Sequence, residues 1–154
     1  PYEHYASRYP GILLERYRDE AEALPGAVQF VRKLRDAGMP IAVASSSISP
    51  WVEAALARIG LGDAFDITVT GSDVTAGKPD PAIYLLAAKR IGFAPGDCLA
   101  IEDAPAGIES AHAAGMTCWA VRTEYTRGLA LPNPDREFDT LNDISIDDVI
   151  GVAA

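Results

Sequence analysis

The sequence has no apolar run that could cross a bilayer and only two cysteines among its 154 residues. Because a membrane-spanning helix needs about 20 mostly apolar residues, we expect no membrane partner. Cys98 and Cys118 each belong to a short apolar run. We interpret them as buried free thiols, which fits a reducing cytoplasm. Basic residues are also scarce: 13 Lys and Arg stand against 22 Asp and Glu, and the net charge of −9 disfavours nucleic acid as a partner because phosphates are repelled.

One pattern repeats from about residue 25 onward: a short apolar run, a loop, and a helical pattern that begins near proline and ends at glycine. The helical patterns cover residues 25–38, 50–60, 80–92 and 105–115. The apolar runs cover residues 41–44, 67–70, 99–101 and 119–121. Because these runs are mostly apolar instead of alternating, they are typical of strands buried on both faces. Strands that alternate with helices predict an α/β fold with a doubly wound parallel sheet.

The two ends of the chain depart from this pattern. Residues 1–24 are rich in tyrosine and charge, and Pro10–Gly11 predicts a break within a weakly helical segment. From Leu131 onward the sequence predicts a loop followed by a short helix over residues 146–150. The first residue is Pro1 instead of methionine, so we expect either a processed chain or a piece of a longer one.

Serine residues follow the first predicted strand at its carboxyl end, where ligands bind in sheets of this kind. Ser45, Ser46 and Ser47 come directly after residues 41–44 and just before a predicted helix. Hydroxyl and backbone N–H groups beside the positive end of a helix suit a phosphate oxygen. The alternative is that Ser47 or Ser49 only caps the helix.

A lysine lies on a turn directly before the third predicted helix, in the order Gly77-Lys78-Pro79-Asp80-Pro81. The two prolines restrict the backbone on both sides, which limits the directions in which the ammonium group can point. A compact positive charge aimed at the strand ends suits a phosphoryl group or a carboxylate nucleophile. The alternative is an ordinary solvated lysine, with Asp80 and Pro81 serving only to start the helix.

Two adjacent carboxylates, Glu102 and Asp103, lie where the third predicted strand ends and the next helix begins. Hard oxygen ligands in this position suit Mg²⁺, which prefers one or two carboxylates together with water and substrate phosphate. The alternative is that Asp103 only caps the helix that follows.

In this order, the three groups resemble motifs of the haloacid dehalogenase-like superfamily, in the β-phosphoglucomutase-like branch of phosphatases and phosphomutases with a helical cap inserted early in the chain. Ser45 resembles the phosphate-binding residue of the second motif and Lys78 the third motif, whereas Glu102 and Asp103 resemble the acidic fourth motif that holds Mg²⁺. The resemblance implies a Rossmann-like core, Mg²⁺ as the cofactor and a small phosphorylated substrate. It also implies that Ser45 and the N–H of Ser46 donate hydrogen bonds to the transferring group, while Lys78 neutralises negative charge.

The first motif of this family, Asp-x-Asp, occurs nowhere in the 154 residues. In the family, its first aspartate attacks phosphorus to form an aspartyl phosphate, and its strand lies centrally in the sheet. The resemblance therefore implies an incomplete sheet and a chain that is inactive alone. It also implies that residues 1–22 are the end of a helical cap and that residues 23–154 are a core without its first strand. We expect an N-terminal segment or a complementing chain to supply that strand.

The expected function is that of a Mg²⁺-dependent phosphoric monoester hydrolase of the cytoplasm that acts on a small phosphorylated metabolite, such as a sugar phosphate. Within the family, the alternative is a sugar phosphomutase, which returns the phosphoryl group to another hydroxyl. From another class, the alternative is a non-catalytic phosphate-binding or assembly module.

Overall fold

The structure is a computed structural model that describes residues 2–152, with side chains for residues 9–152. Its α-helices are α1 (Tyr2–Glu20), α2 (Ala27–Asp36), α3 (Ser49–Arg58), α4 (Ala82–Ile91), α5 (Pro105–Ala113) and α6 (Ile146–Val152). Two short 3₁₀ helices are η1 (Pro95–Asp97) and η2 (Leu141–Asp143). The strands are β1 (Ala42–Ala44), β2 (Ile67–Val69), β3 (Leu99–Glu102), β4 (Thr117–Val121) and β5 (Arg136–Phe138).

The repeated pattern of strands and helices is confirmed from α2 to β4, and α6 lies where the short C-terminal helix is predicted. Strand β5 is a correction, because the sequence predicts a loop there. Arg136 and Glu137 are exposed, so the segment has no apolar run to mark it. Charged side chains are common on edge strands, where they discourage pairing with other chains.

The strands form two parallel sheets, β1-β2 and β3-β4-β5. In the first sheet Val43 lies opposite Thr68, and in the second Ala100 lies opposite Cys118. Within residues 2–152 no strand pairing joins β1 to β3. One edge of each of these strands therefore has no partner strand in the described part of the chain.

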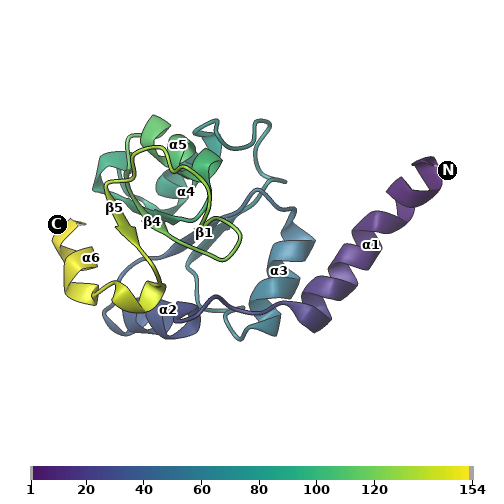
Figure 1. The fold of residues 1–154 in the computed structure, drawn as a ribbon, viewed down its shortest axis with the longest axis horizontal. Helices are drawn as coiled ribbons and strands as arrows, with labels where there is room; N and C mark the ends of the chain where they lie inside the picture. Colours follow the sequence, from purple (N-terminus) through teal and green to yellow (C-terminus); the bar gives the residue numbers. More distant parts are fainter. Residues whose placement is uncertain (1, 153–154) are drawn as a thin grey trace.

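Helices α4 and α5 cover one face of both sheets, and α2 covers the opposite face of the β3-β4-β5 sheet (Figure 1). Ile83 of α4 and Ile108 of α5 are almost fully buried against Val69 of β2 and Cys118 of β4. This cluster spans the two sheets and holds them together where no strand pairing does. Because apolar burial contributes about 25 cal/mol per Å², it is the main source of their cohesion.

The second core cluster lies between the strands and the helices α2 and α6. Phe30 and Leu34 of α2 pack with Trp119 and Val121 of β4 and with Val149 of α6. Neighbouring residues of β4 therefore alternate between the two clusters, as side chains of a strand must. Burial of β4 on both faces confirms helices on both faces of the β3-β4-β5 sheet.

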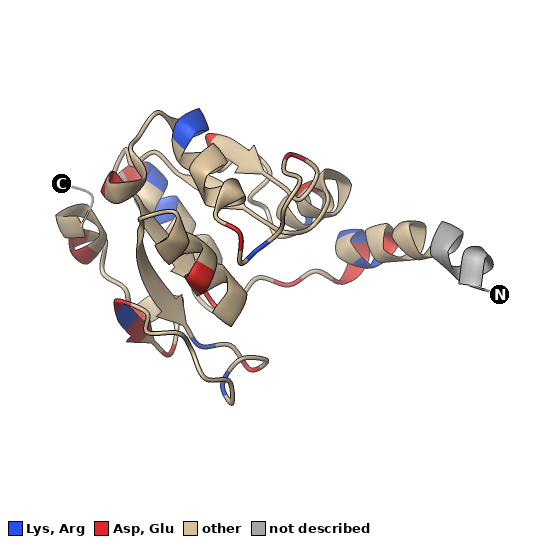
Figure 2. Ribbon diagram, turned by 90° about the horizontal axis from the view of Figure 1, so that it is seen from above, with Lys and Arg blue, Asp and Glu red and all other residues tan. Residues whose placement is uncertain are grey.

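Charged residues of both signs are distributed over the helices and loops (Figure 2). Several are paired on the surface, including Arg35 with Asp66 and Arg122 with Glu137. None of the helices in the described chain is both long and apolar enough to span a membrane.

Helix α1 extends away from the sheets and packs against α3 (Figure 1). The predicted break is wrong, since α1 continues through Pro10 and Gly11. Proline removes one helical hydrogen bond, and contacts with α3 help to compensate. Trp51 Nε1 donates to the carbonyl oxygen of Pro10 at 3.2 Å, and the Trp51 ring stacks on Tyr17 with centroids 6.0 Å apart. Trp51 is thus a packing residue.

Candidate functional site

A pocket of about 440 Å³ lies at the carboxyl ends of β1 and β3. The five residues to which the resemblance assigns a role all line it, namely Ser45, Ser46, Lys78, Glu102 and Asp103, whereas Ser47 does not. They come from three segments that are far apart in the chain. Parallel strands bring their carboxyl ends to one edge, which is why residues 33 and 24 positions apart meet here.

The serine loop, residues 45–48, leaves β1 and leads into α3. Ser45 N donates to the carbonyl oxygen of Val69 at 2.9 Å, which extends the β1-β2 ladder by one residue. Ser45 Oγ accepts from Ser47 N at 3.2 Å, so the hydroxyl hydrogen of Ser45 is left to donate elsewhere. No side chain caps α3, whose N-cap residue is Ile48. The structure therefore does not favour the alternative that Ser47 or Ser49 is only a helix cap.

The side chain of Lys78 points inward and is 13% exposed, which excludes a solvated surface lysine. Its Nζ forms an ion pair with Glu102 Oε1 and donates to the carbonyl oxygen of Ala44 at 3.0 Å. Ser45 N bonds to β2, and neighbouring residues of a strand direct their backbone groups to opposite sides. The Ala44 carbonyl therefore points away from β2, toward the edge of β1 that lacks a partner strand.

The turn that carries Lys78 is fixed from two sides. Ser110 of α5 is fully buried, and its Oγ donates to the carbonyl oxygen of Asp80 at 2.7 Å. Asp80 Oδ1 in turn accepts from Ala82 N at 2.9 Å, at the start of α4. Asp80 thus supports the start of the helix as expected, although Pro81 is the N-cap residue.

Glu102 is buried, and its carboxylate is held by three donors. Lys78 Nζ and the hydroxyl of Tyr84 both contact Oε1, while Asp103 N donates to Oε2 at 3.2 Å. Behind it lies Gly107 of α5, where any Cβ would overlap the carboxylate. The Lys78 ammonium also lies 4.7 Å from the centre of the Tyr84 ring. Burial and the charge of Glu102 raise the pKa of Tyr84, which keeps its hydroxyl protonated as a donor.

Asp103 is the second carboxylate of the pocket, and it has fewer partners. Within residues 9–152 no donor contacts its carboxylate, and Ala104 is the N-cap residue of α5, so the cap interpretation is not favoured. Burial, followed by the charge of Glu102, raises its pKa, and Lys78 partly opposes the shift. A half-buried carboxylate with unused oxygens fits the hard ligands that Mg²⁺ prefers.

The described residues would provide only part of a metal site. No group of three or more His, Cys, Asp or Glu that could hold a metal occurs among them. Glu102 already accepts three hydrogen bonds, so Asp103 is the better direct ligand. Because Mg²⁺ usually keeps several waters and takes phosphate oxygens as ligands, one carboxylate from this chain fits such a site.

Replacing Asp103 with asparagine is expected to stabilise the metal-free chain at pH 7. The raised pKa means that the ionised Asp103 carboxylate is less favourable in the folded chain than in the unfolded chain. It therefore lowers the free energy of unfolding fully above the raised pKa, and not at all below the unfolded pKa of about 3.9. The gain should shrink as the pH falls through the raised pKa. Thermal unfolding between pH 3.5 and 7 measures this gain.

In the same thermal unfolding experiment, Mg²⁺ should raise the Tm of the wild type but not that of Asp103→Asn. An equal rise in both would mean that Asp103 is not a metal ligand.

Comparison with protein families identifies the class. Residues 4–115 match the model of the haloacid dehalogenase-like hydrolases. The chain belongs to this family, as the resemblance of its motifs predicts.

Two curated relatives and one solved structure are similar to the chain. It is 37% identical to protein YhcW of Bacillus subtilis over 83% of the chain, and 43% identical to hexitol phosphatase A of Escherichia coli K12 over 64% of the chain and 45% of that protein. The crystal structure of CbbY from Rhodobacter sphaeroides in complex with phosphate superposes with a TM-score of 0.78 at 28% identity, over 82% of this chain. The chain spans 58% of YhcW and 58% of the CbbY chain.

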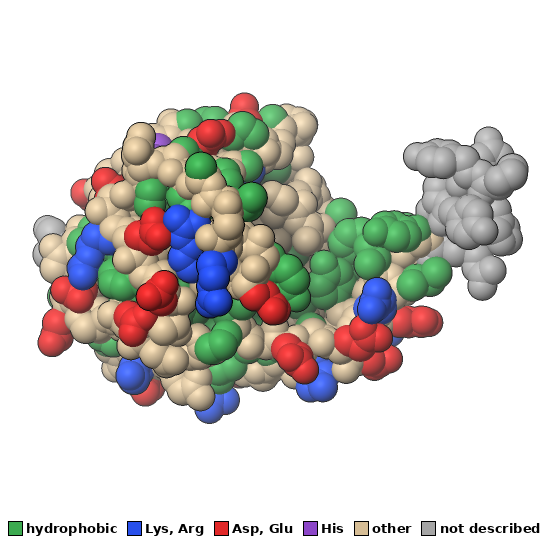
Figure 3. Space-filling view, viewed as in Figure 1, with side chains coloured by type: hydrophobic (Ala, Val, Ile, Leu, Met, Phe, Trp, Pro, Cys, Tyr) green, Lys and Arg blue, Asp and Glu red, His purple; other side chains and the backbone are tan. Residues whose placement is uncertain are grey.

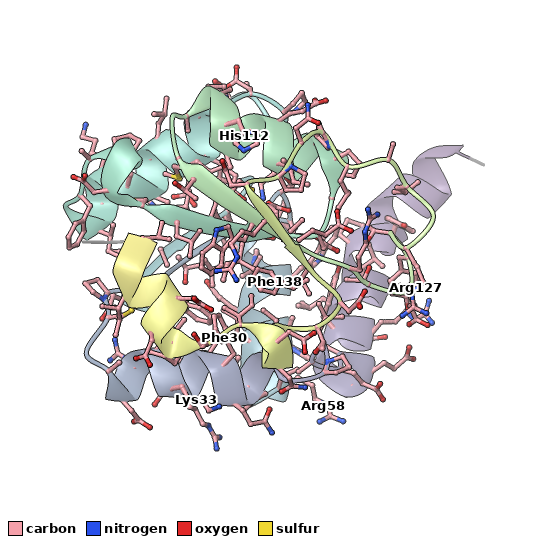
Figure 4. The ribbon with its side chains drawn as sticks, turned by 60° about the vertical axis from the view of Figure 1, so that its left-hand side comes forward. Phe30, Lys33, Arg58, His112, Arg127 and Phe138 are labelled. Atoms are coloured by element: carbon pink, nitrogen blue, oxygen red, sulfur yellow. The ribbon has the colours of Figure 1, made fainter. Side chains whose placement is uncertain are left out.

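The sequence did not reveal the residues that hold the pocket side chains and the Lys78 turn in place. Tyr84 and Ser110 contact the predicted residues through packing between helices and loops, which no motif signals. His112, by contrast, lies on α5 away from the labelled residues of α2 (Figure 4) and pairs with Asp135 at 3.1 Å. It does not line the pocket.

Proposed function

We propose that this chain forms the phosphate-binding core of a phosphatase that acts on a small phosphorylated metabolite, with a sugar-type phosphate as the favoured class. The observation that carries the proposal is the convergence of Ser45, Ser46, Lys78, Glu102 and Asp103 on one pocket. The similarity to hexitol phosphatase A and to a CbbY structure with bound phosphate supports it.

In this proposal, each residue acts on a different part of the phosphoryl group. The hydroxyl of Ser45 and the backbone N–H of Ser46 donate to its oxygens, and the Lys78 ammonium offsets its negative charge. Glu102 holds Lys78 in place through their ion pair. Asp103 would hold Mg²⁺, with Glu102 adding negative charge from behind, and the bound metal would stabilise charge on the transferring oxygens.

We also propose that the nucleophilic aspartate comes from a strand between β1 and β3. The facing edges of these strands have no partner strand within residues 2–152, and unpaired backbone groups are costly when buried. A parallel strand there would end beside Lys78, where a carboxylate would meet a positive charge. The strand would come from a segment or chain other than residues 1–154, because these contain no Asp-x-Asp. Its aspartate would attack phosphorus and displace the alcohol of the substrate, and water would then hydrolyse the aspartyl phosphate to release inorganic phosphate.

Helix α1 fits the proposed role of a cap remnant. Tyr9 and Ile12 are 59% and 50% exposed, and hydrophobic side chains lie along the side of α1 seen in Figure 3. We propose that these side chains pack against further helices of the cap.

The two free cysteines, Cys98 and Cys118, support the proposal of a cytoplasmic location, because the cytoplasm keeps thiols reduced.

Titration with inorganic phosphate tests the proposed site. In ¹H–¹⁵N NMR spectra of the 154-residue chain with Mg²⁺, phosphate should shift the amides of Ser46 and Ser47 in a saturable manner. The amide of Gly92, at the far end of α4, should not shift. Shifts of similar size at Gly92 and Ser46, or none at all, would contradict the proposal.

The chain alone is expected to show no turnover of p-nitrophenyl phosphate with Mg²⁺, because the proposed nucleophile is absent. Released p-nitrophenol, measured against a buffer control, checks this. Turnover that is lost on Lys78→Met would mean that a residue within the chain is the nucleophile, and the proposal of a separate strand would be wrong.

A further inference from the structure

The loop after β2 holds the serine loop in place through Gly71. Gly71 N donates to the carbonyl oxygen of Ser47 at 2.8 Å. A Cβ at residue 71 would overlap the carbonyl oxygen of Ser46 and lie 3.1 Å from its carbonyl carbon. Only glycine therefore allows this close approach of the two backbones. The backbone of Gly71 thus packs against the peptide groups of Ser46 and Ser47.

Thr70, the residue before Gly71, belongs to a chain of hydrogen bonds whose donors and acceptors can be assigned. Asp73 Oδ2 accepts from both N and Oγ1 of Thr70, at 2.9 and 2.8 Å. An ionised carboxylate can only accept, so Thr70 gives its single hydroxyl hydrogen to Asp73. The 2.8 Å contact between Ser49 Oγ and Thr70 Oγ1 must then be a donation from Ser49. Ser49, the first residue of α3, is thereby tied to Asp73 through Thr70.

Arg90 completes the network from α4. Its Nη2 donates to Asp73 Oδ1 at 2.8 Å, and its Nη1 donates to the carbonyl oxygen of Thr68 at 3.4 Å. The backbone amide of Thr70 and the guanidinium of Arg90 lower the pKa of Asp73 to about 2. Asp73 is therefore ionised near neutral pH. Thr70 is 2% exposed, so water does not compete for its contacts.

We infer that Asp73 is a positioning residue of the phosphate site, holding the serine loop through Thr70 and Ser49. None of the three is among the residues that line the pocket, so their effect on a ligand would pass through the loop. The inference rests on the proposed function of Ser45 and Ser46.

Asp66 offers a matched control at the opposite end of β2. Asp66 also pairs with an arginine, Arg35 at 2.6 Å, and also accepts from a backbone amide, Ile41 N at 3.0 Å. It lies outside the pocket that holds Ser45. Asp66→Asn and Asp73→Asn therefore weaken similar interactions, but only the interactions of Asp73 connect to the serine loop.

The test compares phosphate affinity and amide exchange in the two variants. Asp73→Asn should weaken the binding of inorganic phosphate about tenfold in the NMR titration, which is the lower end of the loss of about 10–100-fold seen when a residue that supports a metal ligand is removed. It should also speed hydrogen exchange of the Gly71 amide about tenfold, the effect expected for a lost hydrogen bond to a charged group. Asp66→Asn should change neither. Thr70→Val should reproduce Asp73→Asn, and Thr70→Ser, which keeps the hydroxyl, should restore wild-type behaviour.

The outcomes separate this inference from the proposed function. If the wild type does not bind phosphate, the proposed function fails, and exchange at Gly71 still decides whether Asp73 holds the loop. If the wild type binds and Asp73→Asn binds equally well, the positioning inference is overturned and the proposed function stands. Equal effects of Asp66→Asn and Asp73→Asn would show a general effect on stability and also overturn it. If Asp73→Asn does not fold, the comparison of Thr70→Val with Thr70→Ser gives the answer.

Discussion

Replacing Lys78 with methionine is expected to lower the free energy of unfolding by about 3 kcal/mol at pH 7, because it leaves a buried carboxylate without its cation. The side chains of Lys78 and Glu102 are only 13% and 8% exposed, so water cannot take the place of the ammonium. The hydroxyl of Tyr84 and the amide of Asp103 would remain as donors. They place the expected loss at the lower end of the range of about 3–5 kcal/mol for a broken buried pair.

Urea denaturation measures this loss, and a double variant separates charge from packing. Adding Glu102→Gln to Lys78→Met removes the unpaired charge and should recover most of the stability. Lys33→Met is the control, because Lys33 lies on α2 and its side chain points outward (Figure 4). A surface substitution of this kind is expected to change stability by less than about 0.5 kcal/mol. If Lys78→Met were as mild as Lys33→Met, the ion pair would not stabilise the fold.

The same substitution should abolish the phosphate-induced shifts at Ser46 and Ser47. The ammonium is the only cation among the described residues that line the pocket. In a chain with net charge −9, an anion needs such a local positive charge to bind. Phosphate binding that survives in Lys78→Met would place the anion at another site.

The sequence predicts most of the fold because the pattern of apolar runs and helical faces is local. Proline near the start of helices and glycine after them mark α3, α4 and α5 within a few residues. Strand β5 and the continuous helix α1 escape such rules. Their stability depends on contacts with distant segments: β5 pairs with β4, and α1 packs on α3 through Trp51. Strand order is likewise a tertiary property, so the pattern alone does not show which strands pair.

For the site, the sequence predicts the residues at strand ends but not the network that positions them. Ser45, Lys78 and Glu102 belong to recognisable motifs, whereas Tyr84 and Asp73 are ordinary residues of a helix and a loop. Asp73 has no distinctive motif, although it follows a predicted strand. Its role depends on Arg90 and Thr70, which no spacing rule connects to the serine loop. Only the three-dimensional contacts reveal these supporting residues.

Replacing Gly107 with alanine is expected to destabilise the chain by about 2–3 kcal/mol, although helix propensity alone would favour alanine by about 1 kcal/mol. Gly107 lies in α5 and is buried, and an added Cβ would overlap the carboxylate of Glu102. A flexible side chain could move away, but this one is held by Lys78, Tyr84 and the amide of Asp103. Moving it would break at least one hydrogen bond to a charged group, worth about 1.5–3 kcal/mol. The clash therefore outweighs the gain in propensity.

Gly11→Ala is the matched control, because Gly11 lies inside α1 and, apart from the nearby backbone of that helix, no atom of the described residues comes within 4 Å of its added Cβ. Alanine should be neutral or favourable there, by up to about 1 kcal/mol. In a Glu102→Asp background, where the carboxylate is one methylene shorter, the penalty of Gly107→Ala should largely disappear. Urea denaturation of the four combinations measures this coupling. If Gly107→Ala were as well tolerated as Gly11→Ala in the wild-type background, the Glu102 carboxylate would have to be mobile, and its role in fixing Lys78 would be lost with it.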